Sequence, residues 1–411
     1  MQPTRTLQTY VCGSSGPLDD FNPFLVMKQK WAPELLCALN ERPLTLGEIS
    51  SALEIDKKEA SKLLGDLTRI KAVKEQSGIY SVTFSIFTRK DLSILKRATR
   101  PIASEISNSI SDHKREIDSF VKNLSSSEQV GRGKLLFATL GCFVLDWLGL
   151  KTLEDEGVLI KSKPQPGNRN YVLFAREQLK PSDAEKLYGK MYWGSNTDEI
   201  DRWVFTSFGD FTGVRYAFPD VVWSLGALSK IDQKSNKTPS WMSEKMSNIF
   251  SLTSKRLLKD VGLMLSRLNS DGLVSRATPE KNSQATDTLD VARLLEDMNY
   301  ISREKGVFKL NYPVFTAEDS KVIEQLGNLV SPFITKTFHH HCSKLQESLR
   351  NTSPIRNKVE FTEVLNDAWH WIFAQTNRIL AEKGFLYDPP KKRAGEARYI
   401  AWMSEFHPYF P

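Results

Sequence analysis

The sequence is poor in cysteine, and its four cysteines stand far apart. They are Cys12, Cys37, Cys142 and Cys342, and no two of them are separated by the two residues of a CxxC pair. This spacing is not that of a disulfide framework or of a zinc ribbon. We therefore expect reduced, buried thiols without a chemical role.

A long apolar run is also missing. The longest stretch, residues 135–150, is interrupted by Asp146 and by glycines, and it is shorter than the roughly 20 residues that a membrane-spanning helix needs. No apolar segment precedes Cys12, so neither a signal peptide nor a lipid anchor is expected. The sequence thus predicts a cytoplasmic protein with no membrane partner.

Catalytic signatures are absent as well. No serine, histidine and aspartate set has a known local pattern, and residues 131–134 lack the spacing of a phosphate loop. The only dense group of metal-type ligands is residues 339–342, where helical spacing places only His339 and Cys342 on one face. Because zinc sites need three or four ligands, we expect no metal, no cofactor and no enzyme activity.

The chain does have an ordinary globular composition and a positive charge. Its 411 residues are 40% hydrophobic and 26% charged, a composition and length typical of about two to four folded domains. The formal net charge of +7 permits a polyanionic partner without by itself indicating one.

The sequence contains an internal repeat. Residues 73–91, VKEQSGIYSVTFSIFTRKD, align without a gap with residues 301–319, ISREKGVFKLNYPVFTAED, at an offset of 228. Three further pairs of segments align: 137–160 with 361–387, 170–178 with 398–405, and 31–41 with 217–228. We therefore expect two copies, at about 20–180 and 210–408, that form a pseudo-dimer within one chain.

The first copy has the element order of a winged helix-turn-helix. The predicted elements are a helix over 31–40, a short helix over 46–53, a third helix over 57–70, and hairpin strands over 72–75 and 79–87. Thr45 and Glu48 have the spacing of a capping box at the short helix, and Asp56 is a suitable N-cap for the third. In the second copy the corresponding helices are predicted over 239–250 and 254–268, followed by an enlarged wing.

Positive charge is concentrated in the predicted third helices. Residues 57–74 hold six Lys or Arg against two acids, and residues 254–276 hold five against two. An exposed helix fits the major groove of DNA, and its cations neutralise phosphates, although charged helix faces are often only solvated. The candidate DNA-binding residues are Lys57, Lys58, Ser61, Lys62, Arg69, Lys74, Lys255, Arg256, Lys259 and Arg267.

Residues 31–87 resemble the ArsR-like winged-helix superfamily of bacterial and archaeal transcription regulators. The resemblance implies sequence-specific binding to duplex DNA through the third helix, 57–70, with a wing at 75–80. The metal-sensing members carry a closely spaced cysteine pair in a helix, whereas Cys37 stands alone here. Metal-responsive release is therefore not expected.

Together these patterns predict an α+β fold, mainly α, with tandem winged-helix domains that are each followed by a helical and β-hairpin extension. The predicted parts are a tail (1–20), winged helix one (21–90), extension one (91–180), a connector (181–209), winged helix two (210–316) and extension two (317–411).

The expected function is transcription regulation. The alternative is a protein-interaction scaffold, for which the apolar residues Val261, Met264 and Leu265 of the second copy are suited. The aromatic-rich extensions leave open a pocket for an unknown small-molecule effector.

Overall fold

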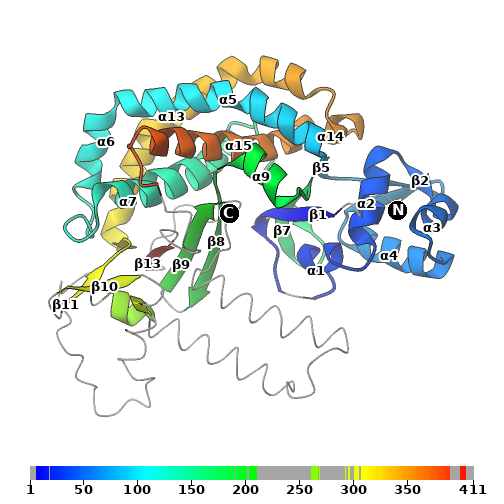
Figure 1. The fold of residues 1–411 in the computed structure, drawn as a ribbon, viewed down its shortest axis with the longest axis horizontal. Helices are drawn as coiled ribbons and strands as arrows, with labels where there is room; N and C mark the ends of the chain where they lie inside the picture. Colours follow the sequence, from blue (N-terminus) through cyan, green and yellow to red (C-terminus); the bar gives the residue numbers. More distant parts are fainter. Residues whose placement is uncertain are drawn as a thin grey trace, which may run out of the picture.

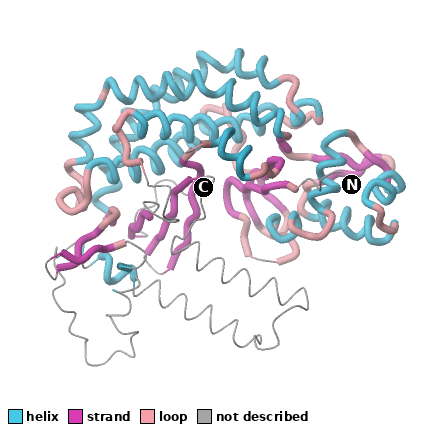
Figure 2. Tube along the Cα trace, in the orientation of Figure 1, coloured by secondary structure: helices cyan, strands magenta, loops and turns pink. Residues whose placement is uncertain are grey.

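The computed structural model describes residues 6–17, 19–189, 191–200, 203–210, 261–266, 268, 292, 295–296, 300–304, 307–388 and 399–403 (Figure 1). In this part of the chain the fold is mixed α/β with helix predominating, as the sequence predicts (Figure 2). Most of the second winged helix predicted over 210–316 lies outside the described residues.

An N-terminal unit follows the predicted order of helices and hairpin. Its elements are α1 (Pro23–Met27), α2 (Ala32–Glu41), β2 (Leu44–Thr45), α3 (Leu46–Leu53), α4 (Lys57–Arg69), β3 (Val73–Gln76) and β4 (Ile79–Val82). The predicted capping box at α3 is confirmed, because the Thr45 N–H donates to Glu48 Oε2 over 2.8 Å and the Glu48 N–H donates to Thr45 Oγ1 over 3.3 Å. Strands β2, β4 and β3 form one small antiparallel sheet.

The single strand predicted over 79–87 is wrong. It is two strands, because β4 ends at Val82 and β5 (Ser85–Phe87) leaves the hairpin to pair in parallel with β7 (Arg169–Glu177). All three residues of β5 are buried, so the strand has neighbours on both faces and no polar alternation to distinguish it from a continued β4.

The tail predicted over 1–20 contains a strand. β1 (Leu7–Ser14) pairs antiparallel with β7 over its whole length, and β6 (Lys163–Gln165) also pairs with β7. β7 is therefore the centre of this sheet, with β5 and β1 as its partners. The partner of β1 lies about 160 positions along the chain, so the pairing that makes this segment a strand is not visible in its local sequence.

The two faces of β7 serve two different parts of the molecule. Tyr171, Leu173 and Ala175 belong to the core of the N-terminal unit. On the other face, Arg176 forms a fully buried ion pair with Asp367, and the Phe174 ring lies 5.4 Å from the His370 ring. Alternate residues of a strand point to opposite faces, so this strand joins the N-terminal unit to the helices above it.

A layer of helices lies over the β7 sheet and over a second four-stranded sheet (Figure 1). Its members are α5 (Arg89–Asp112), α6 (Lys114–Val121), α7 (Arg132–Leu136), the π-helix η1 (Phe137–Leu148), α8 (Gly149–Asp155), α9 (Pro181–Tyr188), α13 (Ala317–Leu349), α14 (Ser353–Arg356) and α15 (Phe361–Glu382). Helix α5 packs mainly against α15 and α13, and α13 packs against η1.

The segment predicted as a connector, 181–209, is also structured. After α9 it forms β8 (Tyr192–Ile200) and most of β9 (Trp203–Asp210). Strand β9 pairs antiparallel with β13 (Tyr399–Met403), which pairs in parallel with β12 (Val314–Phe315). The pairing of β9 with β13, almost 200 residues away, is not visible in a local stretch of the sequence.

The repeat in the sequence has a structural counterpart. Hairpin β10 (Ile301–Glu304) and β11 (Val307–Leu310) has the register of β3 and β4 shifted by 228, since Val73 faces Val82 and Ile301 faces Leu310. Each larger sheet also shares a plan: its central strand, β7 or β13, pairs antiparallel with one long strand, β1 or β9, and in parallel with a short one, β5 or β12, and β7 pairs with β6 in addition. The sequence-based alignment over 73–91 and 301–319 therefore follows equivalent elements.

Each half binds the other through a buried aspartate. Asp91 and Asp319 cap α5 and α13 in equivalent capping boxes. Asp91 Oδ1 accepts from the Ser353 N–H of the second half over 3.2 Å, and Asp319 Oδ1 accepts from the Ser125 N–H of the first half over 2.7 Å. Both carboxylates are 2% exposed, so these bonds across the halves satisfy charges that water does not reach.

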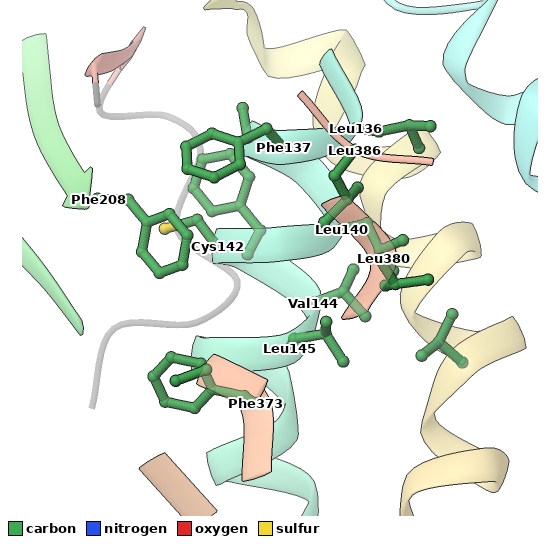
Figure 3. Packing of buried hydrophobic residues seen from close by; sticks show 14 of the residues in the cluster. Leu136, Phe137, Leu140, Cys142, Val144, Leu145, Phe208, Phe373, Leu380 and Leu386 are labelled. Atoms are coloured by element: carbon green, nitrogen blue, oxygen red, sulfur yellow. The ribbon is translucent and has the colours of Figure 1, made fainter. Parts of the chain in front are cut away.

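The most apolar helical stretch lies inside this assembly. Figure 3 shows Phe137 and Cys142 of η1 near Phe208 of β9, with Leu140 on the side of Leu380 in α15. Arg132–Asp155 has the length and composition of a membrane span, but 72% of its apolar window is buried within the protein. Its apolarity is accounted for by its place in the core.

We expect Asp319→Ala to lower the free energy of unfolding by about 3 kcal/mol, because the change removes a buried charged acceptor that the Thr316 and Ser125 N–H groups share. Urea denaturation of the full chain measures the change. Asp112→Ala, at the exposed end of α5, is the control. A loss no larger than that of the control would contradict the role of the buried aspartate.

Glu363 on α15 gives the stability a pH dependence. Burial raises the pKa of its carboxyl from 4.5 to about 7, against the opposing effect of Lys163. Because the folded pKa is the higher one, the folded state binds the proton more tightly, and stability falls as the pH rises from about 5 to about 8. We expect Glu363→Gln to flatten this decline in urea denaturation, whereas Glu347→Gln, at an exposed position of α13, leaves it intact.

Candidate nucleic-acid interface

Helix α4 has one buried face and one basic face. The Asp56 side chain accepts from the Glu59 N–H over 2.7 Å and so begins the helix at the predicted position. Ala60, Leu63, Leu64 and Leu67 are buried in the core of the N-terminal unit. The predicted residues on the other face are exposed: Lys57, Lys58, Ser61, Lys62 and Arg69.

The lysines of this face are not neutralised by the protein. In the described residues Lys57, Lys58 and Lys62 form no ion pair. Arg69 differs, because its Nη2 lies 2.9 Å from Asp66 Oδ1. Its charge is therefore largely offset, and the i,i+3 spacing of the two residues was the signal in the sequence that could have shown this. Lys71, exposed directly after α4, was missing from the prediction.

The position of the lysines is unfavourable for the isolated helix. Lys57 and Lys58 occupy the first two positions of α4, where the helix dipole has its positive end and cations cost a few tenths of a kcal/mol each. Backbone N–H groups at this end also lack partners within the helix. Both features favour an anion from outside, such as a phosphate.

Gly65 keeps the middle of the same face flat. It lies inside α4 and is exposed, and a Cβ placed there would have no atom within 4 Å. Nothing in the described structure therefore requires a glycine, although an interior helical glycine costs about 1 kcal/mol relative to alanine. Close approach of another molecule to the helix backbone is one physical reason for such a residue.

The hairpin beside α4 has the form expected of a wing. Ser77 and Gly78 both have positive φ, 53° and 78°, as a tight two-residue turn requires. Lys74 on β3 is exposed, as predicted. Next to the turn, Ile79 is 45% exposed. Figure 1 shows α3 and α4 at the edge of the molecule, away from the helical layer.

The second half does not present an equivalent free surface in its described part. Lys255, Arg256, Lys259 and Arg267 lie outside the described residues. In the hairpin of this half, Lys309 pairs with Glu304, and Arg303 lies 3.6 Å from Glu296. Val261, Met264 and Leu265 are buried in the main core, so they are not the exposed apolar surface that the scaffold alternative expected.

The other candidates of the sequence are placed apart from α4. His339 lies 2.7 Å from Glu156, and His341 lies 2.9 Å from Glu105. Within the described residues no three His, Cys, Asp or Glu side chains gather into a metal-binding group. The four cysteines are free thiols, and burial raises the pKa of Cys12 to about 12, which keeps this thiol protonated at neutral pH.

Comparison with protein-family models, curated proteins and solved structures finds no match to this chain.

We expect Gly65→Ala to raise the free energy of unfolding by about 1 kcal/mol, because it adds a better helix former where no atom obstructs a Cβ. Thermal or urea denaturation measures the gain. Gly149→Ala is the opposite case, since its Cβ would lie 2.3 Å from Trp369, and it should destabilise the fold. A loss of stability in Gly65→Ala would contradict the open surface at this position.

Proposed function

We propose that the protein binds duplex DNA through the N-terminal unit as a winged helix, with α4 in the major groove and the β3–β4 hairpin as its wing, and that it regulates transcription. The observation that carries the proposal is the set of exposed lysines at the start of α4, which have no carboxylate partner in the described structure. An α-helix fits the major groove, and lysines at its start meet phosphates or base edges.

Two further features support this proposal. Gly65 leaves room for a groove wall against the helix backbone, and the exposed Ile79 lies at the tip of the hairpin, where an apolar side chain is able to contact the minor groove. The repeat suggests a second DNA contact from the same chain. Two linked contacts would raise affinity through effective concentration.

Salt dependence provides the first test. We expect the full-length protein to bind random duplex DNA with an affinity that falls steeply with salt, because phosphate binding releases counterions. The variant with Lys57, Lys58 and Lys62 changed to Ala should reduce the slope of log affinity against log salt by about 2.7, at about 0.9 per lost phosphate contact. Fluorescence anisotropy at several salt concentrations measures both slopes.

The matched control removes the same charge elsewhere. Lys114, Arg115 and Lys122 are exposed on and just after α6, at the other end of the molecule, and their change to Ala should leave the slope unchanged. Equal loss of binding in both variants would indicate nonspecific attraction to a basic protein. Negligible binding by the unaltered protein would favour the protein-interaction scaffold instead.

Gly65→Ala separates the DNA contact from stability. The added methyl group should weaken DNA binding several-fold while the fold becomes more stable, because the group occupies the space that the groove wall needs. Anisotropy titration with duplex DNA measures the affinity, and Thr68→Ala, at an exposed position of the same helix, is the control. Unchanged affinity in Gly65→Ala would contradict close approach at this position.

A further inference from the structure

A cavity of about 750 Å³ lies where the N-terminal unit meets the helical layer. Helix α2 contributes Cys37 and Asn40, the start of α5 contributes Ser93 and Arg97, and α14 contributes Arg356. The volume is within the roughly 300–1,000 Å³ of small-molecule sites. The cavity thus involves both halves of the chain and the unit that carries α4.

The lining has one cationic side. Lys90 and Arg97 are seven residues apart on α5, so they lie on the same face of that helix. Arg356 is held in place because its guanidinium donates to the Asn351 carbonyl over 2.6 Å and to Ser353 Oγ over 2.8 Å. In the described residues none of the three has a carboxylate partner.

Two of the other charged residues of the lining, Arg89 and Glu177, have partners within the protein. The Arg89 guanidinium lies 3.0 Å from Asp183, and its backbone N–H donates to Glu177 Oε2 over 2.7 Å. Glu41 is exposed at the rim. Four cations therefore face two acids in the lining, an excess that attracts an anion.

Part of the lining is apolar. Leu7 and Ile94 line the cavity and are half-buried, so each keeps surface that water reaches. Ile86 and Phe87 of β5 also line it but are already buried within the protein. An inorganic ion would leave Leu7 and Ile94 facing water, whereas an anion that carries an apolar part would cover them and gain from their burial.

We propose that this cavity binds a small organic anion, whose carboxylate or phosphate is held by Lys90, Arg97 and Arg356 and whose apolar part lies against Leu7 and Ile94. The ligand would touch α2, which packs against α3, and α14, whose following residue Asn357 donates to Asn40 of α2. It would therefore bias the position of the N-terminal unit on the helical layer. This regulatory part rests on the proposed DNA binding.

Anilinonaphthalene sulfonate is a suitable probe, because it is an organic anion whose fluorescence rises when its rings leave water. We expect the full-length protein to bind it, and the double variant Lys90→Glu with Arg97→Glu to bind it about tenfold more weakly, a loss of about 1.4 kcal/mol. The control, Lys114→Glu with Arg115→Glu on α6, changes the net charge equally and should bind as the unaltered protein does. Equal binding by both double variants would overturn the proposal.

A second variant separates shape from charge. Ser93→Phe fills the cavity between Lys90 and Arg97 without a change of charge and should also weaken dye binding about tenfold; unchanged binding would overturn the site. Decanoate should displace the dye, whereas the same concentration of inorganic phosphate should not. Displacement by phosphate as effective as that by decanoate would overturn the apolar part of the proposal.

The regulatory part has its own readout. Decanoate should change the DNA affinity of the unaltered protein and leave that of Ser93→Phe unchanged; an equal effect on both would overturn the coupling. Dye binding is measured without DNA, so a failure of the proposed DNA binding leaves the result for the cavity intact, and the two failures are distinguishable.

Discussion

The buried carboxylates of Asp91 and Asp319 hold the two halves of the chain in register. Each caps a long helix of its own half through Oδ2 and accepts an N–H of the other half at Oδ1. A deeply buried carboxylate is costly unless its acceptors are used, so the Oδ1 of each aspartate depends on the other half. The long helices pack across the same junction, α5 on α15 and α13 on η1.

The N-terminal unit is joined to this assembly by β7 and by the end of α14. β7 contributes Tyr171 and Leu173 to the core of the unit, while Arg176 on its other face pairs with Asp367 of the second half. Asn357, directly after α14, donates to Asn40 of α2. The cavity beside α2 lies at the same junction.

The two halves share a plan but not their chemistry. In the first half Phe87 of β5 pairs with Arg176 of β7, and in the second half Phe315 of β12 pairs with Trp402 of β13. The first half thus has an arginine, which needs a buried carboxylate, at the position where the second half has an apolar residue. The hairpins differ in the same way, since Lys74 is exposed whereas Lys309 pairs with Glu304. The two lysines therefore differ in whether they have a carboxylate partner among the described residues.

Local residue patterns were enough to predict the capping box of Thr45 and Glu48, the start of α4 at Asp56, the buried stripe of that helix and the repeat of the hairpins. Each of these features involves residues three or four positions apart or two adjacent strands, so a short stretch of sequence contains its pattern. Long-range packing was needed to make 7–14 and 203–210 strands, to divide 79–87 between two sheets, and to bring Lys90, Arg97 and Arg356 to one cavity. Their partners lie between about 80 and 270 residues away, and contacts at such separations depend on the packing of whole elements, which no local period encodes.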